Sequence, residues 1–241
     1  MVTRDVRQAG RDSAVAARAR WAETYLHHHF ADPKLLERAL THRSASKHNN
    51  ERLEFLGDAF LNFTIARRLY DSRPDASEGD LSRARAALVN QATLAEIGRE
   101  IGIDRQLVLG KGELRSGGAQ RAAVIADAVE AVIGAVLLDG GGEVAERLVD
   151  RLFAARLESL PASAELKDPK TRLQEWLQGR GLPLPAYSVS DVEGRDHEQV
   201  FTVLCRVNGL DIETVGRGRS RRLAEQDAAA AMLAEFAGDQ A

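Results

Sequence analysis

The stretch NERLEFLGD, residues 50–58, places three carboxylates within eight residues, with apolar side chains between them. On a helix that advances about 100° per residue, Glu51, Glu54 and Asp58 share an arc of roughly 60°. The stretch therefore predicts a helix, from about residue 49 to residue 70, with an acidic face and a core face. The apolar side chains of that core face occupy a separate arc of roughly 80°; they are Leu53, Leu56, Phe60 and Phe63.

Three carboxylates on one helical face repel one another, by about 1 to 4 kcal/mol per pair at 4 Å, depending on the local dielectric. A bound divalent cation would offset this repulsion. The alternative is a solvated helix face with Arg52 nearby, and the stretch alone does not decide between the two.

A second acidic pair lies in a strongly apolar helical run, residues 121–139. Asp127 and Glu130 are three residues apart, so they lie about 60° apart in projection. Ala131 and Gly134 lie close to this acidic face, where their small size would let another helix approach. Two charges in such a run are expensive to bury without a partner. A cation between the two acidic helices would supply that partner.

Composition limits the function classes. The chain has 241 residues and a net charge of −3, so any nucleic-acid binding must come from local charge clusters. Its single cysteine, Cys205, cannot form an internal disulfide, and the alternation around it predicts a buried strand residue. Because we find no signal-like N-terminus and no apolar run near 18 residues, we expect a cytoplasmic protein without a membrane partner.

Helical patterns fill the first two thirds of the chain, and alternation typical of strands appears only later. We expect a flexible N-terminal extension at 1–15 and an all-helical domain at 16–160. The composition of PASA, residues 161–164, indicates a linker at 161–167. Residues 168–237 then show the order α-β-β-β-α. The predicted fold class is multidomain, an all-helical domain followed by an α+β domain.

A basic turn precedes the last predicted helix. Residues 217–222 hold four arginines and no acid, at the N-terminus of that helix. Arginine side chains and unsatisfied backbone N–H groups there form a phosphate-binding surface. A solvated arginine turn is the alternative.

Several blocks of the sequence, in order, resemble bacterial ribonuclease III. NERLEFLGD resembles the signature of that family, and three further blocks resemble its later motifs: EGDLS at 78–82 with Arg85, GELRSGG at 112–118 and ADAVEA at 126–131. The C-terminal third, including TRLQE at 171–175, resembles the family's double-stranded-RNA-binding domain. The resemblance covers nearly everything from about residue 16 to residue 236 and implies an all-helical ribonuclease III endonuclease domain followed by that binding domain.

The resemblance also implies an activity. Enzymes of this family are Mg²⁺-dependent endoribonucleases, with Mn²⁺ expected to substitute. They cleave double-stranded RNA to 5′-phosphate and 3′-hydroxyl products with short 3′ overhangs, and they act as homodimers through the catalytic domain. The expected substrates are precursor ribosomal RNA and structured messenger and transfer RNA precursors.

The family's functional residues carry over by position. The match assigns magnesium ligation to Glu54, Asp127 and Glu130, catalytic roles to Asp58 and Glu130, and accessory acidic roles to Glu51 and Glu78. It assigns RNA contacts to Thr171, Gln174 and Glu175 in the first helix of the binding domain, to His197 in a loop, and to a phosphate clamp of Arg219, Ser220, Arg221 and Arg222. The clamp has arginine where lysine is frequent in the family, which keeps the charge but alters the geometry.

The alternative function is a catalytically silent binder of double-stranded RNA. A silent relative is expected to have lost Asp58, Asp127 or Glu130, and all three are present. The sequence therefore favours the nuclease.

Overall fold

The computed structural model describes residues 13–161, 167–195 and 198–238. The chain forms two compact units, residues 1–160 and 161–241. Of the expected N-terminal extension, residues 13–15 fall within the described part and begin a helical stretch that runs to residue 21.

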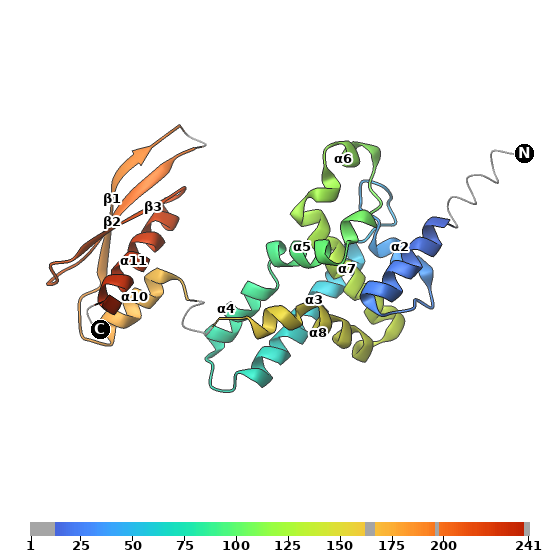
Figure 1. Cartoon of the computed structure of the whole chain (residues 1–241), viewed down its shortest axis with the longest axis horizontal. Helices are drawn as coiled ribbons and strands as arrows, with labels where there is room; N and C mark the ends of the chain where they lie inside the picture. The colour runs from blue at the N-terminus through green and yellow to red at the C-terminus, as the bar shows by residue number, and fades with distance from the viewer. Residues whose placement is uncertain (1–12, 162–166, 196–197, 239–241) are drawn as a thin grey trace, which may run out of the picture. The chain divides into compact units, whose positions relative to one another are not determined.

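The described part of the first unit is helical, apart from an isolated β-bridge between Thr41 and Val108. Its elements after residue 21 are η1 Ala22–Leu26, α2 Pro33–Ala39, α3 Glu51–Ser72, α4 Glu78–Leu88, α5 Gln91–Glu100, η2 Ile103–Arg105, α6 Lys111–Arg115, η3 Gly118–Gln120, α7 Ala122–Gly140 and α8 Gly142–Glu158 (Figure 1).

Short polar side chains define where several of these helices begin. The side chain of Asp32 accepts a hydrogen bond from the backbone N–H of Lys34, and Pro33 occupies the first helical position of α2. Ser77 and Asn90 cap α4 and α5 in the same way. Each cap satisfies a backbone donor that the first helical turn leaves without an intrahelical partner.

Helix α7 lies at the centre of the first unit. It is apolar around most of its circumference, as expected for a helix surrounded by protein, and it contacts α2, α3, α5 and α8. Its closest neighbour is α3, because both helices carry a glycine where they cross. A Cβ atom on Gly57 would lie 1.8 Å from the carbonyl oxygen of Glu130, and one on Gly134 would lie 2.2 Å from that of Leu53. The close approach predicted at Gly134 is therefore confirmed.

The predicted core face of α3 is partly wrong. Leu53 is buried as expected, but the side chain of Phe63 is 59% exposed. The buried stripe instead follows Gly57 along the helix, through residues such as Leu61 and Ile65. Because the two backbones touch at Gly57, the contact line passes through this small residue. Bulky aromatic side chains beside the line have no room between the helices and therefore extend toward the surface.

The second unit is an antiparallel sheet with two helices packed against it. Its elements are α10 Pro169–Gln178, β1 Pro185–Glu193, β2 Val200–Val207, β3 Glu213–Gly218 and α11 Arg221–Gly238, with strand order β1-β2-β3 (Figure 1). The register of β1 against β2 shifts between Val189 and Asp191, where the ladder contains a bulge. Cys205 is fully buried in the core, as predicted.

Glycine again sets the closest contact in this unit. A Cβ atom on Gly216 of β3 would lie 2.1 Å from the backbone nitrogen of Ala228 in α11, so this helix rests directly on the strand. An all-helical unit followed by an α-β-β-β-α unit confirms the predicted fold class.

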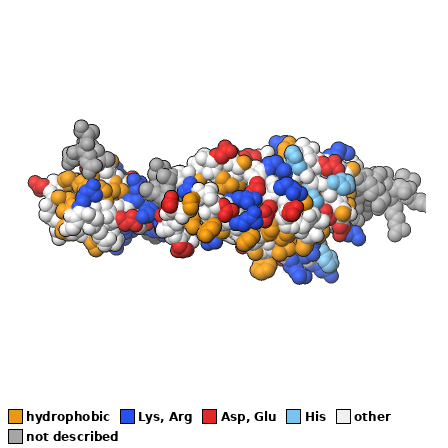
Figure 2. All heavy atoms as spheres, turned by 90° about the horizontal axis from the view of Figure 1, so that it is seen from below, with side chains coloured by type: hydrophobic (Ala, Val, Ile, Leu, Met, Phe, Trp, Pro, Cys, Tyr) orange, Lys and Arg blue, Asp and Glu red, His pale blue; other side chains and the backbone are white. Residues whose placement is uncertain are grey.

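Charge is mixed on the molecular surface. Figure 2 shows Lys and Arg side chains interspersed with Asp and Glu on the face in view, in agreement with the net charge of −3. Among the described helices, none combines the length and the apolar character needed to cross a membrane.

The contact between α3 and α7 generates a stability prediction. Gly57→Ala places a methyl group against the Glu130 carbonyl, so the helices must separate, and we expect a loss of at least about 2 kcal/mol in the free energy of unfolding. Gly112→Ala is the matched control, because its added methyl group would meet no atom within 4 Å; we expect a change within about 0.5 kcal/mol. Urea unfolding of both variants measures the difference, and equal stabilities would contradict the packing described above.

Candidate metal centre and nucleic-acid interface

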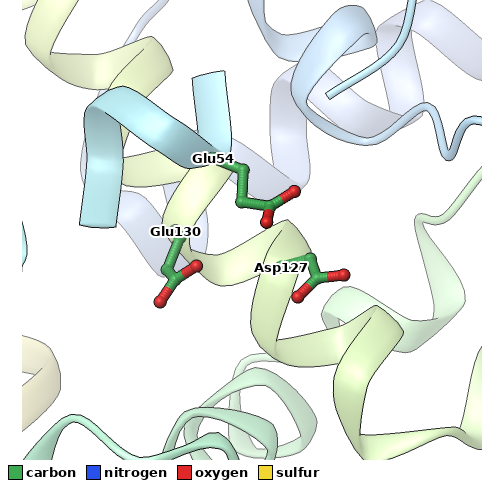
Figure 3. A group of neighbouring side chains, drawn as sticks. All are labelled: Glu54, Asp127 and Glu130. Carbon is green, nitrogen blue, oxygen red and sulfur yellow. The ribbon is translucent and has the colours of Figure 1, made fainter. Parts of the chain in front are cut away.

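The crossing of α3 and α7 gathers three carboxylates. Glu54 projects from α3, and Asp127 and Glu130 lie one turn apart on α7 (Figure 3). One carboxylate oxygen from each of the three residues lies within 4.8 Å of the others. Gly57, whose backbone rests on that of Glu130, follows Glu54 by about one helical turn. The glycine contact therefore sets the distance across which the acids of the two helices meet.

Burial and mutual repulsion perturb all three acids. Burial, followed by the charges of Asp58, Glu54 and Asp127, raises the pKa of Glu130 to about 8. Burial is also the largest cause that raises the pKa of Glu54 and of Asp127. His42 and Arg43 act in the opposite direction on Asp127, but the net direction remains upward. The cations that the chain itself supplies therefore do not balance these carboxylates.

The donor set fits a hard divalent cation. Mg²⁺ and Ca²⁺ prefer oxygen ligands, and Mg²⁺ is commonly held by a few carboxylates together with water molecules. A cation placed among Glu54, Asp127 and Glu130 would supply the missing counter-charge and lower the pKa values that burial raises. The structure thus brings together the three residues that the sequence predicted as metal ligands.

Asp58 and Glu51 lie beside this group. The Oδ1 atom of Asp58 accepts a hydrogen bond of 2.7 Å from Asn62, and the charge of Asp58 contributes to the raised pKa of Glu130. Glu51 accepts a hydrogen bond of 2.9 Å from Asn49 and lies 3.7 Å from Arg43. Both carboxylates are exposed on the same side of α3 as Glu54.

A hollow of about 620 Å³ opens beside the carboxylates. Its lining comprises His42, Arg43, Ser44, Asn50, Glu51, Glu54, Glu113, Arg121, Ala123, Val124 and Asp127. His42 anchors its loop: its backbone N–H donates to the carbonyl of Val108, and its Nδ1 lies 2.8 Å from the hydroxyl of Ser44.

Sequence reasoning missed one ion pair in this lining. Arg121, which precedes the first residue of α7, donates to Glu113 of α6 at 2.8 Å and so links these two helices. Gly118 allows the pair to form, because a Cβ atom there would lie 2.5 Å from the Glu113 side chain. The sequence did carry a signal for this ion pair, since Glu113 and Arg121 are opposite charges on either side of Gly117 and Gly118.

Glu78 lies apart from the three carboxylates within this chain. It belongs to the first turn of α4, where its carboxylate accepts a hydrogen bond of 2.7 Å from Ser82. It lines a different hollow of about 340 Å³, formed by α3 and α4 and shared with Phe63, Ala66, Arg67, Tyr70, Leu81, Ser82 and Arg85.

The predicted RNA contacts of the first helix lie in α10, from its first turn to its middle. Gln174 and Glu175 are exposed, and Glu175 accepts two hydrogen bonds, of 2.6 and 2.8 Å, from Lys167. Thr171 is half-buried and donates to the capping carboxylate of Asp168 at 2.8 Å. The fourth predicted contact, His197, lies outside the described residues.

The predicted phosphate clamp surrounds the start of α11. Arg219, Arg221 and Arg222 are exposed. Ser220 also caps the helix, because its hydroxyl oxygen accepts a hydrogen bond of 3.3 Å from the backbone N–H of Leu223. This cap fixes the first turn of α11, around which the arginines are arranged.

Comparison with known proteins agrees with this architecture. A family model described as "Ribonuclease-III-like" matches residues 32–157, and one described as "Double-stranded RNA binding motif" matches residues 169–235. "Ribonuclease 3" of Nitrosococcus oceani is 58% identical over 211 residues, which cover 87% of this chain and 91% of that protein. "Ribonuclease 3" of Vibrio vulnificus is 54% identical, over 88% of this chain and 94% of that protein.

Among solved structures, the nuclease domain of ribonuclease III from Campylobacter jejuni matches with a TM-score of 0.55 and 40% identity, covering 56% of this chain and 95% of that domain. A second structure of the same domain gives a TM-score of 0.56 at 38% identity, over 59% of this chain and 97% of that domain. Since these relatives are matched almost end to end, the chain belongs to the ribonuclease III family and is an endoribonuclease of double-stranded RNA.

Proposed function

We propose that this endoribonuclease uses Mg²⁺, held by Glu54, Asp127 and Glu130, and leaves 5′-phosphate and 3′-hydroxyl ends with short 3′ overhangs. The observation that carries the proposal is the set of three carboxylate oxygens within 4.8 Å of one another. When held there, Mg²⁺ would supply Lewis acidity that polarises a phosphoryl oxygen, acidifies the attacking water and stabilises charge on the leaving oxygen. Mn²⁺ accepts the same oxygen ligands and is the expected substitute.

The protein supplies rigid placement to this chemistry. Glu54 and Glu130 project from helices whose backbones are in contact, so the repulsion cannot be relieved by separating the helices without loss of this packing. Asp58 accepts a hydrogen bond from Asn62, and we assign it with Glu130 as an essential catalytic carboxylate. The silent-binder alternative is not favoured, since the relatives are ribonucleases and the full acid set is present.

We also propose that the first unit forms a homodimer. Phe55, Phe63 and Tyr70 on α3 are 79%, 59% and 71% exposed, which is unusual for large apolar side chains grouped on one helix. The solved Campylobacter jejuni nuclease domain is described as having a region involved in dimer formation. A twofold dimer matches the symmetry of two antiparallel RNA strands.

The accessory acids fit the same proposal. Glu78 shares its hollow with Phe63 and Tyr70, so it belongs to the surface that we assign to the dimer. In such a dimer Glu78, like Glu51, would serve an acidic valley that two subunits share. This role explains why Glu78 stands apart from the three carboxylates of its own chain.

The second unit is proposed to recognise the duplex by shape. Thr171, Gln174 and Glu175 would contact one minor groove, and His197 would contact the next. The clamp of residues 219–222 would contact the phosphates between them, as A-form RNA is read over about 16 base pairs.

The composition of residues 161–164 and the boundary between the units after Leu160 support a linker at residues 161–167. Precursor ribosomal RNA and structured messenger and transfer RNA precursors are the proposed substrates, in the cytoplasm.

The metal proposal is tested by removing one ligand. We expect Glu130→Gln to cut a long RNA duplex more than about 100-fold more slowly in Mg²⁺. Loss of a hydrogen bond that only supports a metal ligand already lowers activity, and loss of the ligand itself should lower it further. EDTA should abolish cleavage by the unmodified chain, and added Mg²⁺ should restore it. Glu143→Gln, at a side chain that is 94% exposed on α8, is the control. Equal cutting by all of these samples would exclude the mechanism.

The raised pKa of Glu130 predicts a pH dependence of stability. Between its usual value of 4.5 and about 8, the folded metal-free protein holds a proton that the unfolded chain has lost. Stability therefore falls as pH rises through this window. In EDTA, the melting temperature of the unmodified chain should fall relative to that of Glu130→Gln as the pH rises from 5 to 8. A constant difference would show that Glu130 does not titrate there.

The dimer proposal is tested at Phe55. Because a charge cannot be buried in an apolar interface without a partner, we expect Phe55→Glu to shift the chain from dimer to monomer in light scattering after size exclusion. Leu138→Glu is the matched control, since Leu138 is 57% exposed on α7. A dimer that persists in Phe55→Glu would place the interface elsewhere.

A further inference from the structure

A partly buried carboxylate links the two helices that carry the predicted RNA contacts. Glu225 lies one turn into α11, and only 12% of its side chain is exposed. Its Oε1 atom accepts a hydrogen bond of 2.9 Å from the Nε of Arg221, and its Oε2 atom accepts one of 2.5 Å from the Nζ of Lys170. Both oxygens are thus engaged, one by the clamp and one by α10.

Lys170 is itself held from a second side. Its ammonium lies 4.6 Å from the centre of the Tyr187 ring, which belongs to β1. Hydrogen bonds from Lys170 first, and then from Arg221, keep the pKa of the Glu225 carboxyl below its usual range. Glu225 is therefore charged at neutral pH, and Lys170 supplies a counter-charge that does not come from the clamp.

The hydrogen bond to Glu225 leaves the terminal amino groups of Arg221 available to a ligand. The bond to Glu225 uses Nε, whereas 64% of the side chain is exposed. The terminal amino groups of a guanidinium form the fork that binds a phosphate through two hydrogen bonds. Holding Nε in place before RNA arrives reduces the side-chain freedom lost on binding.

We propose that Glu225 is a positioning residue for duplex RNA. It fixes the Arg221 fork toward an RNA phosphate, while Lys170 neutralises the carboxylate so that Arg221 keeps its net charge. This inference rests on the proposed phosphate contact of Arg221. It reverses the expectation from charge alone, because removal of an acid from an RNA-binding surface should strengthen binding, whereas loss of a positioning residue weakens it.

The test measures binding of a blunt RNA duplex of about 20 base pairs, long enough for one binding module, by the full chain in EDTA to prevent cleavage. We expect Glu225→Ala to bind about 3- to 10-fold more weakly, the effect of releasing one side chain that was held in place. The slope of log affinity against log salt should fall in magnitude by about 0.9, equivalent to one phosphate contact. Glu235→Gln, at an exposed acid of the same helix, is the charge control and should bind within about 2-fold of the unmodified chain.

A double-mutant cycle separates positioning from a general effect. Arg221→Ala alone should weaken binding, and the double variant Arg221→Ala/Glu225→Ala should bind no more weakly than Arg221→Ala. Lys170→Met should also weaken binding, since it leaves the Glu225 charge beside the clamp. Melting curves establish that each variant is folded at the assay temperature. If Glu225→Ala is not folded at that temperature, Glu225→Gln replaces it and should also bind the duplex more weakly.

Two results would overturn the inference alone: tight binding by Glu225→Ala while Arg221→Ala binds weakly, or losses that multiply in the double variant. Unchanged binding by Arg221→Ala would overturn the proposed clamp contact, and the inference would fail with it.

Discussion

The backbone contact between α3 and α7 is the constraint on which the catalytic unit depends. Gly57 and Gly134 let the two helices meet with no side chain between them. This close approach of the two helices brings Glu54 within reach of Asp127 and Glu130. Packing and chemistry therefore share one set of atoms, because the carbonyl that Gly57 touches belongs to Glu130, a residue of the acidic group. A wider crossing would weaken the core and disperse the carboxylates together.

The two units handle charge in opposite ways. The first concentrates acids where burial raises their pKa values, an arrangement that a retained proton or an added cation balances. The second places one carboxylate, Glu225, between two cations, Lys170 and Arg221, in a module without an overall basic character. In the proposed mechanism, a metal ion bound by the acids would reverse the sign at the centre, and the proposed arginine contacts would hold the anionic duplex elsewhere.

Periodicity in the sequence was sufficient to predict the acidic helix, the small-residue contact at Gly134 and the α-β-β-β-α order. It could not predict which face of α3 is buried, because apolar density favoured Phe63 whereas the contact follows Gly57. The grouping of Glu54 with Asp127 spans more than seventy residues, and the family resemblance supported it more strongly than spacing did. The pair Glu113–Arg121 and the cap at Ser220 depend on local backbone geometry, which composition does not encode.

The carbonyl of Glu130 supports the helix crossing, while its carboxylate faces the acidic group. A change confined to the carboxylate therefore leaves the scaffold intact and also removes a source of repulsion. Such a protein would be a folded, nuclease-deficient reagent that still carries its complete RNA-binding module. It could retain duplex transcripts on a column for identification, so the division of labour within one residue offers a route to the cellular RNAs that this enzyme processes.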